Sequence, residues 1–207
     1  MNVISTSFCW KLRNFVGDMK CVWFEDGGLL EHYHDMEWGI PCHSDRLQFE
    51  YLMLECMSAG LSWSLMLQKR QIFKACFADF DYKKVAVFTE EDVTKAMEYP
   101  GMIKSRRKIE TVVSNARNFI KIQQEFGSFD KYLWSFTDGK TLIYQSHING
   151  NWETKNVLSD QIAGDLKKRG FKFLGSTLIC SYLQGVGMIN DHMPACDMFE
   201  KIGGKIV

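Results

Sequence analysis

Two pairs of Cys and His residues stand near opposite ends of the chain, in mirror-image order. Cys21 and His34 come first, and His192 and Cys196 follow after residues 35–191. The three residues between His192 and Cys196 place both side chains on one face of a helix or tight turn, where with the first pair they form a candidate Cys2His2 zinc site. Such a site requires the two ends of the chain to meet. The alternative, which spacing leaves open, is that the cysteines are small buried apolar residues.

The spacing of apolar residues predicts an all-α protein. Prolines interrupt the chain only at Pro41, Pro100 and Pro194, and between them apolar residues recur at intervals of three and four rather than in alternation. This is the periodicity of amphipathic helices. We therefore expect roughly eight to ten helices, with strands at most marginal.

Capping residues and glycines indicate where these helices begin and end. Ser44 is placed to cap a helix through Cys56, and Gly60 ends it. Thr89 and Asp92 form a capping-box pattern ahead of a short helix. Further helices are expected over residues 61–77, 102–125, 159–169 and 175–188, and another begins after its cap at Ser128. The second of these ends near Gly127, and Ser159 caps the third. Residues 138–156 are expected to form a polar loop between lobes.

Size and composition are those of an ordinary globular protein. The chain has 207 residues and a mass of 24.0 kDa, with 46% hydrophobic and 24% charged residues, which suits one large domain or two small lobes sharing a core. No apolar run approaches the ~20 residues of a membrane span, so we expect no membrane association. The seven cysteines are odd in number and irregularly spaced, which argues against a disulfide framework and favours the cytoplasm.

Basic residues gather in two short runs, although the chain as a whole is neutral. Its 25 basic and 25 acidic residues give no global field to attract a polyanion, so any nucleic-acid binding is local. The runs over residues 104–108 and 167–172 are each suited to contact phosphates. The alternative for either run is a solvated helix face.

The first basic run follows a pattern of helix, tight glycine turn and helix. Pro100 and Gly101 form the turn, and Lys104 begins the basic run behind it. A hairpin of this kind points the free amides at the N-terminus of its second helix outward, where they can bind a phosphate. The segment resembles a helix-hairpin-helix DNA-binding element, and the alternative is a generic connection between two helices.

A carboxylate and several aromatic residues mark a second candidate site. Glu55 lies in an apolar helix just before the Gly60 break, where burial of its charge favours a positively charged ligand. Aromatic faces stack on nucleobases and attract cations, and such residues are concentrated in the front third of the chain. The alternatives are that Glu55 is the exposed edge of an amphipathic helix and that the aromatic residues fill the core. The aromatic residues in question are Trp23, Tyr33, Trp38 and Trp63.

Four segments, in this order, resemble the 3-methyladenine DNA glycosylase I (Tag) family. The resemblance runs in register from about Cys21 to Cys196. The segments are Tyr33-His-Asp-Met-Glu-Trp-Gly39, Glu55 with Ala59-Gly-Leu-Ser-Trp63, Gly170-Phe-Lys-Phe-Leu-Gly175, and Asn190-Asp-His192 followed three residues later by Cys196.

The resemblance implies a role for each matching residue. It implies one structural zinc ion bound by the four Cys and His residues, with the base-contacting and catalytic role on Glu55. It implies base stacking on Tyr33 and Trp63, with Trp23 and Trp38 as further pocket aromatics. The implied DNA contacts are Gly60 and Leu61, which fill the gap left by a flipped base, and the hairpin residues Gly101, Met102, Ile103 and Lys104.

The implied fold is the all-α helix-hairpin-helix glycosylase fold, with two helical lobes and a zinc site joining the N- and C-terminal segments. We expect an N-terminal extension over 1–20, a glycosylase domain over 21–196 with its hairpin element at about 92–118, and a C-terminal tail over 197–207. The implied substrate is double-stranded DNA with alkylated bases. The implied protein is a monomer in the bacterial cytoplasm that associates with the nucleoid when bound to DNA.

The implied reaction is hydrolysis of the N-glycosidic bond of 3-methyladenine. In related glycosylases an Asp after the hairpin assists the reaction, and members with lyase activity carry a Lys nucleophile in the hairpin. Residues 104–118 contain Glu110 but no Asp. We therefore expect a monofunctional enzyme without lyase activity.

Two positions depart from the family pattern. Ser58 stands where the family commonly has Gln, and Leu30 stands where a pocket Tyr is common. These departures leave open a second hypothesis, a DNA-damage or DNA-structure binding protein of the same fold with weak or no excision activity. A third hypothesis, a hydrolase with a catalytic zinc ion, requires an open coordination position, which four protein ligands do not provide.

Overall fold

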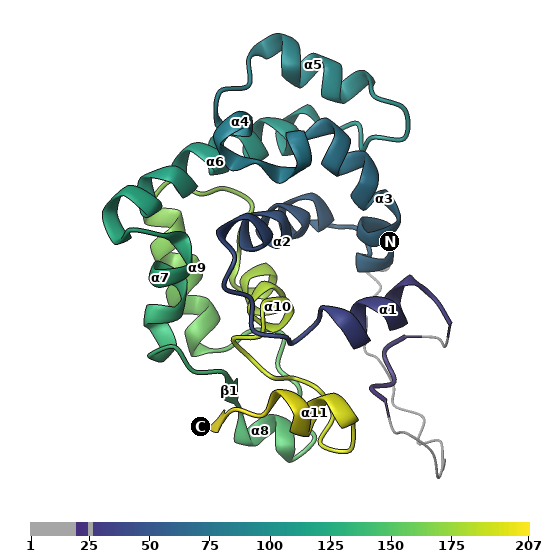
Figure 1. The fold of residues 1–207 in the computed structure, drawn as a ribbon, viewed down its shortest axis with the longest axis vertical. Helices are drawn as coiled ribbons and strands as arrows, with labels where there is room; N and C mark the ends of the chain where they lie inside the picture. Colours follow the sequence, from purple (N-terminus) through teal and green to yellow (C-terminus); the bar gives the residue numbers. More distant parts are fainter. Residues whose placement is uncertain (1–19, 25–26) are drawn as a thin grey trace, which may run out of the picture.

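The computed structural model describes residues 20–24 and 27–207, and most of them lie in helices (Figure 1). The prediction of an all-α protein is thus confirmed apart from one small sheet. The predicted extension, residues 1–20, lies outside the described residues except for Lys20. The elements are α1 (Leu29–Met36), α2 (Asp45–Ser58), α3 (Trp63–Cys76), η1 (Ala78–Phe80), α4 (Tyr82–Ala86), α5 (Glu90–Glu98), α6 (Arg106–Phe126), α7 (Phe129–Trp134), η2 (Ser135–Thr137), β1 (Leu142–Ile143), α8 (Gln145–Ile148), α9 (Val157–Lys168), α10 (Ser176–Gly185), α11 (Asp197–Ile202) and β2 (Lys205–Ile206).

Helix α2 runs through the middle of the molecule. Figure 1 shows α4, α5 and α6 at one end and α8 and α11 at the other, with α2 between them. Every residue of α2 from Gln48 to Ser58 is buried, and the helix packs against α3, α6, α7 and α10. A helix buried all round needs apolar residues on every face, which explains why this one lacks a clear amphipathic pattern.

Several predicted helix boundaries are confirmed. The Ser44 side chain caps α2, and Thr89 and Asp92 form a reciprocal capping box at the start of α5. Gly127 ends α6 in a left-handed conformation with φ of 88°, and Ser128 caps α7. Each of these residues satisfies backbone groups that a helix end leaves without partners.

Two predicted helix starts were wrong. Helix α6 begins at Arg106 rather than near residue 102, because the hairpin turn continues as extended chain through Ser105. Helix α9 begins after Asn156, whose side chain accepts a hydrogen bond from the backbone N–H of Ser159. Ser159 is thus the third residue of the helix, and its hydroxyl accepts a hydrogen bond from the Asn156 backbone N–H in return.

The segment predicted as a loop between lobes, residues 138–156, contains β1 and α8. Strand β1 pairs in parallel with β2, with Leu142 opposite Lys205 and Ile143 opposite Ile206. The predicted C-terminal tail therefore folds back as α11 and β2 against the body of the protein, as Figure 1 shows. The part of the chain that the structure describes has eleven α-helices, just above the expected range, because α4, α8 and α11 are short.

The turn between α5 and α6 depends on a glycine. Gly101 has φ of 79°, and an added Cβ would lie 2.7 Å from the Cδ1 atom of Ile72 on α3. Lys69 on α3 donates a hydrogen bond to the Gly101 carbonyl. The hairpin is therefore held against α3, the helix that starts at Trp63. Within the described residues, no helix is both long and apolar enough to cross a membrane.

Candidate active site and metal centre

The four Cys and His residues of the two distant pairs meet in one buried cluster. The possible ligand atoms of Cys21, His34, His192 and Cys196 all lie within 4.8 Å of one another, and each of the four residues is buried. His192 Nδ1 lies 3.1 Å from His34 Nε2 and 3.6 Å from the Cys21 sulfur, and Cys196 sulfur lies 3.6 Å from His34 Nε2. Metal–ligand bonds of ~2.0–2.3 Å in a tetrahedron separate ligand atoms by about 3.3–3.8 Å. These side chains can therefore hold a metal ion.

Hydrogen bonds orient both imidazole rings toward the centre of the cluster. His34 Nδ1 lies 2.7 Å from the Asp35 carboxylate, and His192 Nε2 lies 3.0 Å from the Trp38 carbonyl. Because both partners only accept hydrogen bonds, these nitrogens are the donors, and Nε2 of His34 and Nδ1 of His192 are left free as ligands. Lys20 in turn bonds the Asp35 carboxylate at 2.7 Å.

The Cys196 sulfur atom is also prepared for a cation. Hydrogen bonding from the Cys21 thiol holds the pKa of Cys196 far below its usual range, whereas the same pairing and burial raise the pKa of Cys21. The Met193 backbone N–H donates to the Cys21 sulfur at 3.2 Å. A thiolate is the form of cysteine that binds metal, so this donor set suits a thiophilic ion.

Trp23 and Trp38, which the sequence analysis assigned to a base pocket, lie against this cluster. Their ring centroids are 5.1 Å apart, the Trp38 ring lies 4.5 Å from that of His192, and the Trp23 ring lies 5.7 Å from that of His34. In the described part of the chain, no ring contact joins either of them to Trp63. The two indoles therefore form an apolar wall around the metal-binding residues.

Glu55 is a buried carboxyl group without a cation beside it. Only 5% of its surface is exposed, and among the described residues it forms no ion pair. Burial raises its pKa to about 8, and the hydrogen bond that Ser58 donates at 3.3 Å acts in the opposite direction. The predicted burial is confirmed. Because no cation in the described chain stabilises the ionised form of this carboxyl group, a positively charged ligand is its best partner.

Tyr33, on which the charge of Glu55 acts, belongs to a cluster of aromatic rings. The Tyr33 and Trp63 ring centroids are 5.5 Å apart, and Tyr51 lies 6.5 Å from Tyr33. Burial, followed by the charges of Tyr51 and Glu55, raises the pKa of Tyr33 well above its usual value, so its hydroxyl stays protonated. The Trp63 indole N–H is buried and has no hydrogen-bond partner in the described chain.

The two departures from the family pattern lie in this neighbourhood. The Ser58 hydroxyl bonds both the carboxylate and the backbone carbonyl of Glu55, the latter at 2.9 Å. Leu30 is half-buried on α1, three residues and therefore about one helical turn before Tyr33. A short hydroxyl and an aliphatic side chain thus take positions next to the carboxylate and the Tyr33 side of the site.

The turn after α2 is held by a lysine that sequence analysis did not single out. Lys108 of α6 donates hydrogen bonds to the carbonyls of Met57 at 2.9 Å and Ala59 at 2.7 Å. These carbonyls belong to the unsatisfied C-terminal end of α2, where a cation is also favoured by the helix dipole. The turn itself closes with a bond from the Leu61 N–H to the Ser58 carbonyl, and Leu61 is 42% exposed at its tip.

An ion-pair network behind the site was also missed. Arg70 of α3 bonds Glu37 at 2.7 Å and the fully buried Glu50 at 2.6 Å, and the Tyr51 hydroxyl donates to Glu37 at 2.6 Å. The network links α1, α2 and α3 around the aromatic rings. Its members lie far apart in the sequence, so no local motif marks them.

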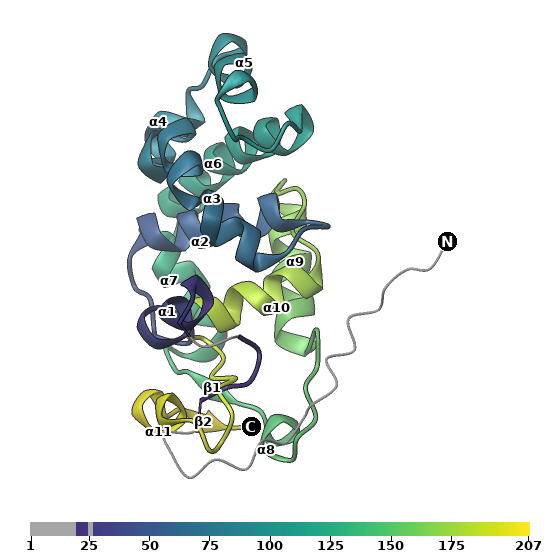
Figure 2. The same ribbon diagram turned by 90° about the vertical axis from the view of Figure 1, so that its right-hand side faces the viewer.

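The predicted hairpin residues form the turn between α5 and α6. Met102 is buried, Ile103 is half-buried and Lys104 is exposed just ahead of α6. Gly101 is exposed on the same turn. Figure 2 shows the connection between α2 and α3, which carries Gly60 and Leu61, projecting on the side of the molecule where α9 lies.

Solved structures with the same fold define the class of the protein. The chain matches a crystal structure of 3-methyladenine DNA glycosylase I (TAG) with a TM-score of 0.81 at 41% identity, covering 86% of this chain and 98% of that one. It also matches the enzyme from Staphylococcus aureus, solved to explain 3-methyladenine recognition, with a TM-score of 0.82 at 35% identity over 87% and 97% of the two chains. The fold is that of these helical DNA glycosylases.

Sequence comparison gives the family. The model for the methyladenine glycosylase family matches residues 23–200. DNA-3-methyladenine glycosylase 1 of Escherichia coli (strain K12) is 38% identical over 177 residues, which are 86% of this chain and 95% of that protein. The DNA-3-methyladenine glycosylase of Haemophilus influenzae is 34% identical over 86% and 96% of the two chains. The chain belongs to the methyladenine glycosylase family.

Proposed function

We propose that this protein is a monofunctional DNA glycosylase that hydrolyses the N-glycosidic bond of 3-methyladenine in duplex DNA. The observation that carries the proposal is the Glu55 carboxyl group, which is buried without a cation and whose charge acts on Tyr33, a residue in ring contact with Trp63. Family membership and the activities named for the relatives support the same substrate.

The chemistry of the lesion suits this site. Methylation at N3 gives the base a positive charge, which makes it a good leaving group and distinguishes it from neutral adenine. A base flipped out of the duplex can place this charge next to Glu55, where the cation lowers the pKa of the carboxyl group and favours its ionised form. The rings of Tyr33 and Trp63 offer their faces to the base, and the Trp63 N–H offers a donor.

Leaving-group departure leaves positive charge on the sugar, and the reaction ends when water adds there. A carboxylate in an apolar site stabilises such a developing charge more strongly than it would in water. We assign this electrostatic role to Glu55. Lys108 is bound to two carbonyls of the α2 terminus, and Lys104 is exposed on the hairpin. Because residues 104–118 contain no Asp that could assist a lysine nucleophile, we assign hydrolysis without lyase activity.

The rest of the DNA interface is assigned by position. Leu61, exposed at the tip of the turn after α2, fills the gap left by the flipped base together with Gly60. The backbone of the hairpin, from Gly101 to Lys104, binds phosphates of the DNA. Residues 21–196 form the glycosylase domain in this proposal, with the hairpin element over about 92–118.

We assign the metal cluster to a single structural zinc ion. The two thiols and two imidazoles have the composition and spacing of a closed tetrahedral site, so the ion supplies stability and no open coordination position. It joins the segment that carries Trp23 and Tyr33 to the C-terminal segment. We also propose that the protein acts as a monomer in the bacterial cytoplasm, associated with the nucleoid when it binds DNA.

A base-release assay tests the proposed activity. Purified protein is incubated with methylated duplex DNA, and the released bases are separated by chromatography. We expect the wild type to release free 3-methyladenine, and Glu55→Gln to release it about 100-fold more slowly. No release from either protein would contradict the enzymatic proposal.

The second candidate function, a damage-binding protein without excision activity, is favoured by the positions of Ser58 and Leu30. A DNA-binding measurement distinguishes it from the glycosylase. Tight binding of methylated DNA without release of a base would support that function instead. Release that survives in Glu55→Gln but disappears on loss of the metal from a folded protein would instead indicate a catalytic metal.

A further inference from the structure

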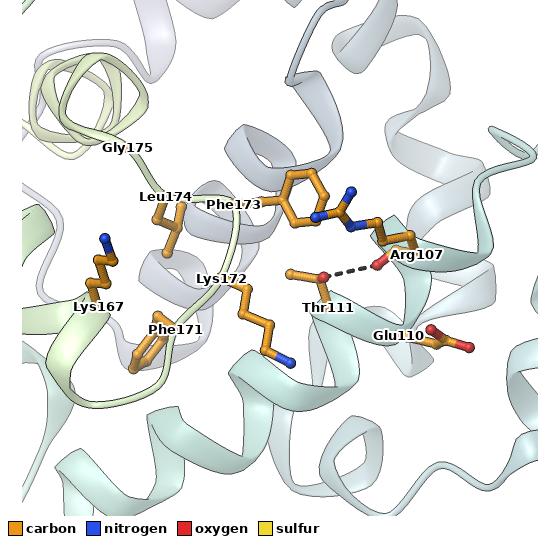
Figure 3. Close-up of a pocket in the computed structure, with 9 residues that line it drawn as sticks. All are labelled: Arg107, Glu110, Thr111, Lys167, Phe171, Lys172, Phe173, Leu174 and Gly175. Carbon is orange, nitrogen blue, oxygen red and sulfur yellow. Dashed lines mark hydrogen bonds between the residues drawn. The ribbon is translucent and has the colours of Figure 1, made fainter.

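A groove of about 610 Å³ lies between α6 and the segment that connects α9 to α10. Its lining brings together the two basic runs of the sequence: Arg107 from the first, and Lys167 and Lys172 from the second. Figure 3 shows Arg107 on one wall and the two lysines on the other. Glu55 is not among the lining residues, so this groove is separate from the candidate base site.

The cations of this groove differ from the two ion-paired arginines of the same runs. Arg106 pairs with Glu90 and with Glu110, and Arg169 pairs with Glu125 and Asp165. In contrast, Arg107, Lys167 and Lys172 are exposed and form no ion pair with any described residue. The fold thus neutralises one arginine of each run, and three of the cations without an ion pair line the same groove.

Arg107 is positioned by an aromatic ring rather than by a carboxylate. Its guanidinium lies 4.8 Å from the centroid of the Phe173 ring. Figure 3 shows the two side chains next to each other. A cation–π contact orients the guanidinium without cancelling its charge. Phe173 has a φ of 56°, a conformation that non-glycine residues rarely adopt, so the surrounding structure holds this ring in place at some energetic cost.

The opposite wall is also fixed. Asn115 of α6, which is fully buried, accepts a hydrogen bond from the Lys172 N–H at 3.0 Å and donates one to the Lys172 carbonyl at 3.1 Å. This clamp holds the backbone of Lys172 against α6, while its side chain is exposed.

The groove adjoins the parts assigned to DNA. The Cys56 thiol, two residues before the end of α2, contacts the Lys172 carbonyl at 3.7 Å. Lys108, the residue after Arg107, binds the Ala59 carbonyl in the turn that carries Leu61. The hairpin leads directly into the first turn of α6, which carries Arg107.

We propose that this groove binds the sugar–phosphate backbone of DNA next to the lesion, through Arg107, Lys167 and Lys172. The inference rests on the proposed function, which supplies duplex DNA as the partner. Cations that lack a carboxylate partner and line a groove beside the inserted turn have the charge and position to bind phosphates. The groove thus provides a phosphate contact in addition to the hairpin.

The salt dependence of DNA binding tests the proposal. Affinity for an unmodified duplex and for a methylated duplex is measured by fluorescence anisotropy at several salt concentrations, for the wild type and for the triple variant Arg107→Gln, Lys167→Gln, Lys172→Gln. Each phosphate contact contributes about 0.9 to the slope of log affinity against log salt concentration. We expect the slope to fall by about 2 to 3, and affinity for both duplexes to fall roughly 10- to 100-fold.

A control variant carries the same loss of charge elsewhere. Lys83→Gln, Lys140→Gln and Lys201→Gln together remove three exposed lysines on α4, before β1 and on α11. We expect this variant to keep the wild-type slope, and circular dichroism to show that both variants are folded. A further substitution, Glu110→Gln, removes the single acidic residue that lines the groove, and we expect it to strengthen binding.

Equal slopes for the groove variant and the control variant would overturn the proposal. If the wild type releases 3-methyladenine and the slopes are equal, the groove assignment alone is wrong. If the wild type neither binds DNA nor releases a base, the proposed function itself fails.

Discussion

The carboxyl group of Glu55 lies in a dry part of the molecule, where burial raises its pKa from the usual 4.5 to about 8. Between these two pH values the folded protein holds a proton on Glu55 that the unfolded chain releases. The stability contributed by this group is therefore present at low pH and is lost as the pH rises from about 4.5 to about 8.

A variant isolates this effect. Glu55→Gln keeps the shape of the side chain but does not titrate. We therefore expect the difference in unfolding free energy, variant minus wild type, to rise by a few kcal/mol between about pH 5 and pH 9, because only the wild type loses stability over this range. Urea unfolding of both proteins across this range measures the difference. A difference that stays constant with pH would show that Glu55 keeps an ordinary pKa.

At the scale of elements, the terminus of α2 depends on Lys108 from α6. The two carbonyls that this ammonium binds have no other partners in the hydrogen bonds of the described chain. Lys108→Met leaves them unsatisfied, so we expect a loss of about 1–3 kcal/mol in unfolding free energy and a lower excision rate, because the turn with Leu61 loses its support.

The matched control for this variant is Lys121→Met on the same helix. Lys121 bonds only the Asn118 side chain, at 3.1 Å. We expect it to retain wild-type stability within about 0.5 kcal/mol and to retain excision. Equal effects of the two substitutions, in chemical denaturation and in the base-release assay, would argue against a special role for Lys108.

The hairpin between α5 and α6 provides a second test at this scale. Gly101→Ala forces a side chain into a left-handed conformation and against Ile72, 2.7 Å away, so we expect a loss of about 1–3 kcal/mol in stability and weaker DNA binding. Gly139 has a similar φ of 72°, and a Cβ added there would meet nothing within 4 Å. Gly139→Ala therefore reports the backbone effect alone. If DNA binding weakens equally in both variants, the hairpin has no specific role in binding DNA.

At the scale of the whole molecule, the Cys/His cluster joins the two ends of the chain. We expect the purified protein to contain about one zinc ion per chain, and we expect Cys196→Ser to lose it and to unfold at a temperature at least several degrees lower. Elemental analysis and thermal unfolding measure both. Cys76→Ser, half-buried and outside the cluster, serves as the control. A wild type without metal and with the same melting temperature as Cys196→Ser would contradict the assignment.

Features that depend on neighbouring residues were predictable from the sequence. The caps at Ser44, Thr89 and Ser128 each act within three residues of their own position, and the structure confirms them. The four members of the Cys/His cluster were also found, because Cys and His are few and their side chains have specific chemistry.

Features that depend on contacts between distant segments were not predictable in the same way. Lys108 reads as one more residue of a basic run until α2 is seen to end beside it. Likewise, the sequence does not separate Arg107 from Arg106, because their difference lies in the acidic partners that the fold supplies. Short helices such as α8 have too few residues to give a periodicity.

The positions of the metal ligands in the sequence also determine when the metal site can form during synthesis of the chain. During synthesis Cys21 and His34 leave the ribosome early, and His192 and Cys196 leave it only after residues 35–191 have followed. The growing polypeptide therefore carries half of a metal site through most of translation, and closure of the site is a late, long-range step of folding. A premature stop codon anywhere before position 192 leaves that half-site without its second pair of ligands.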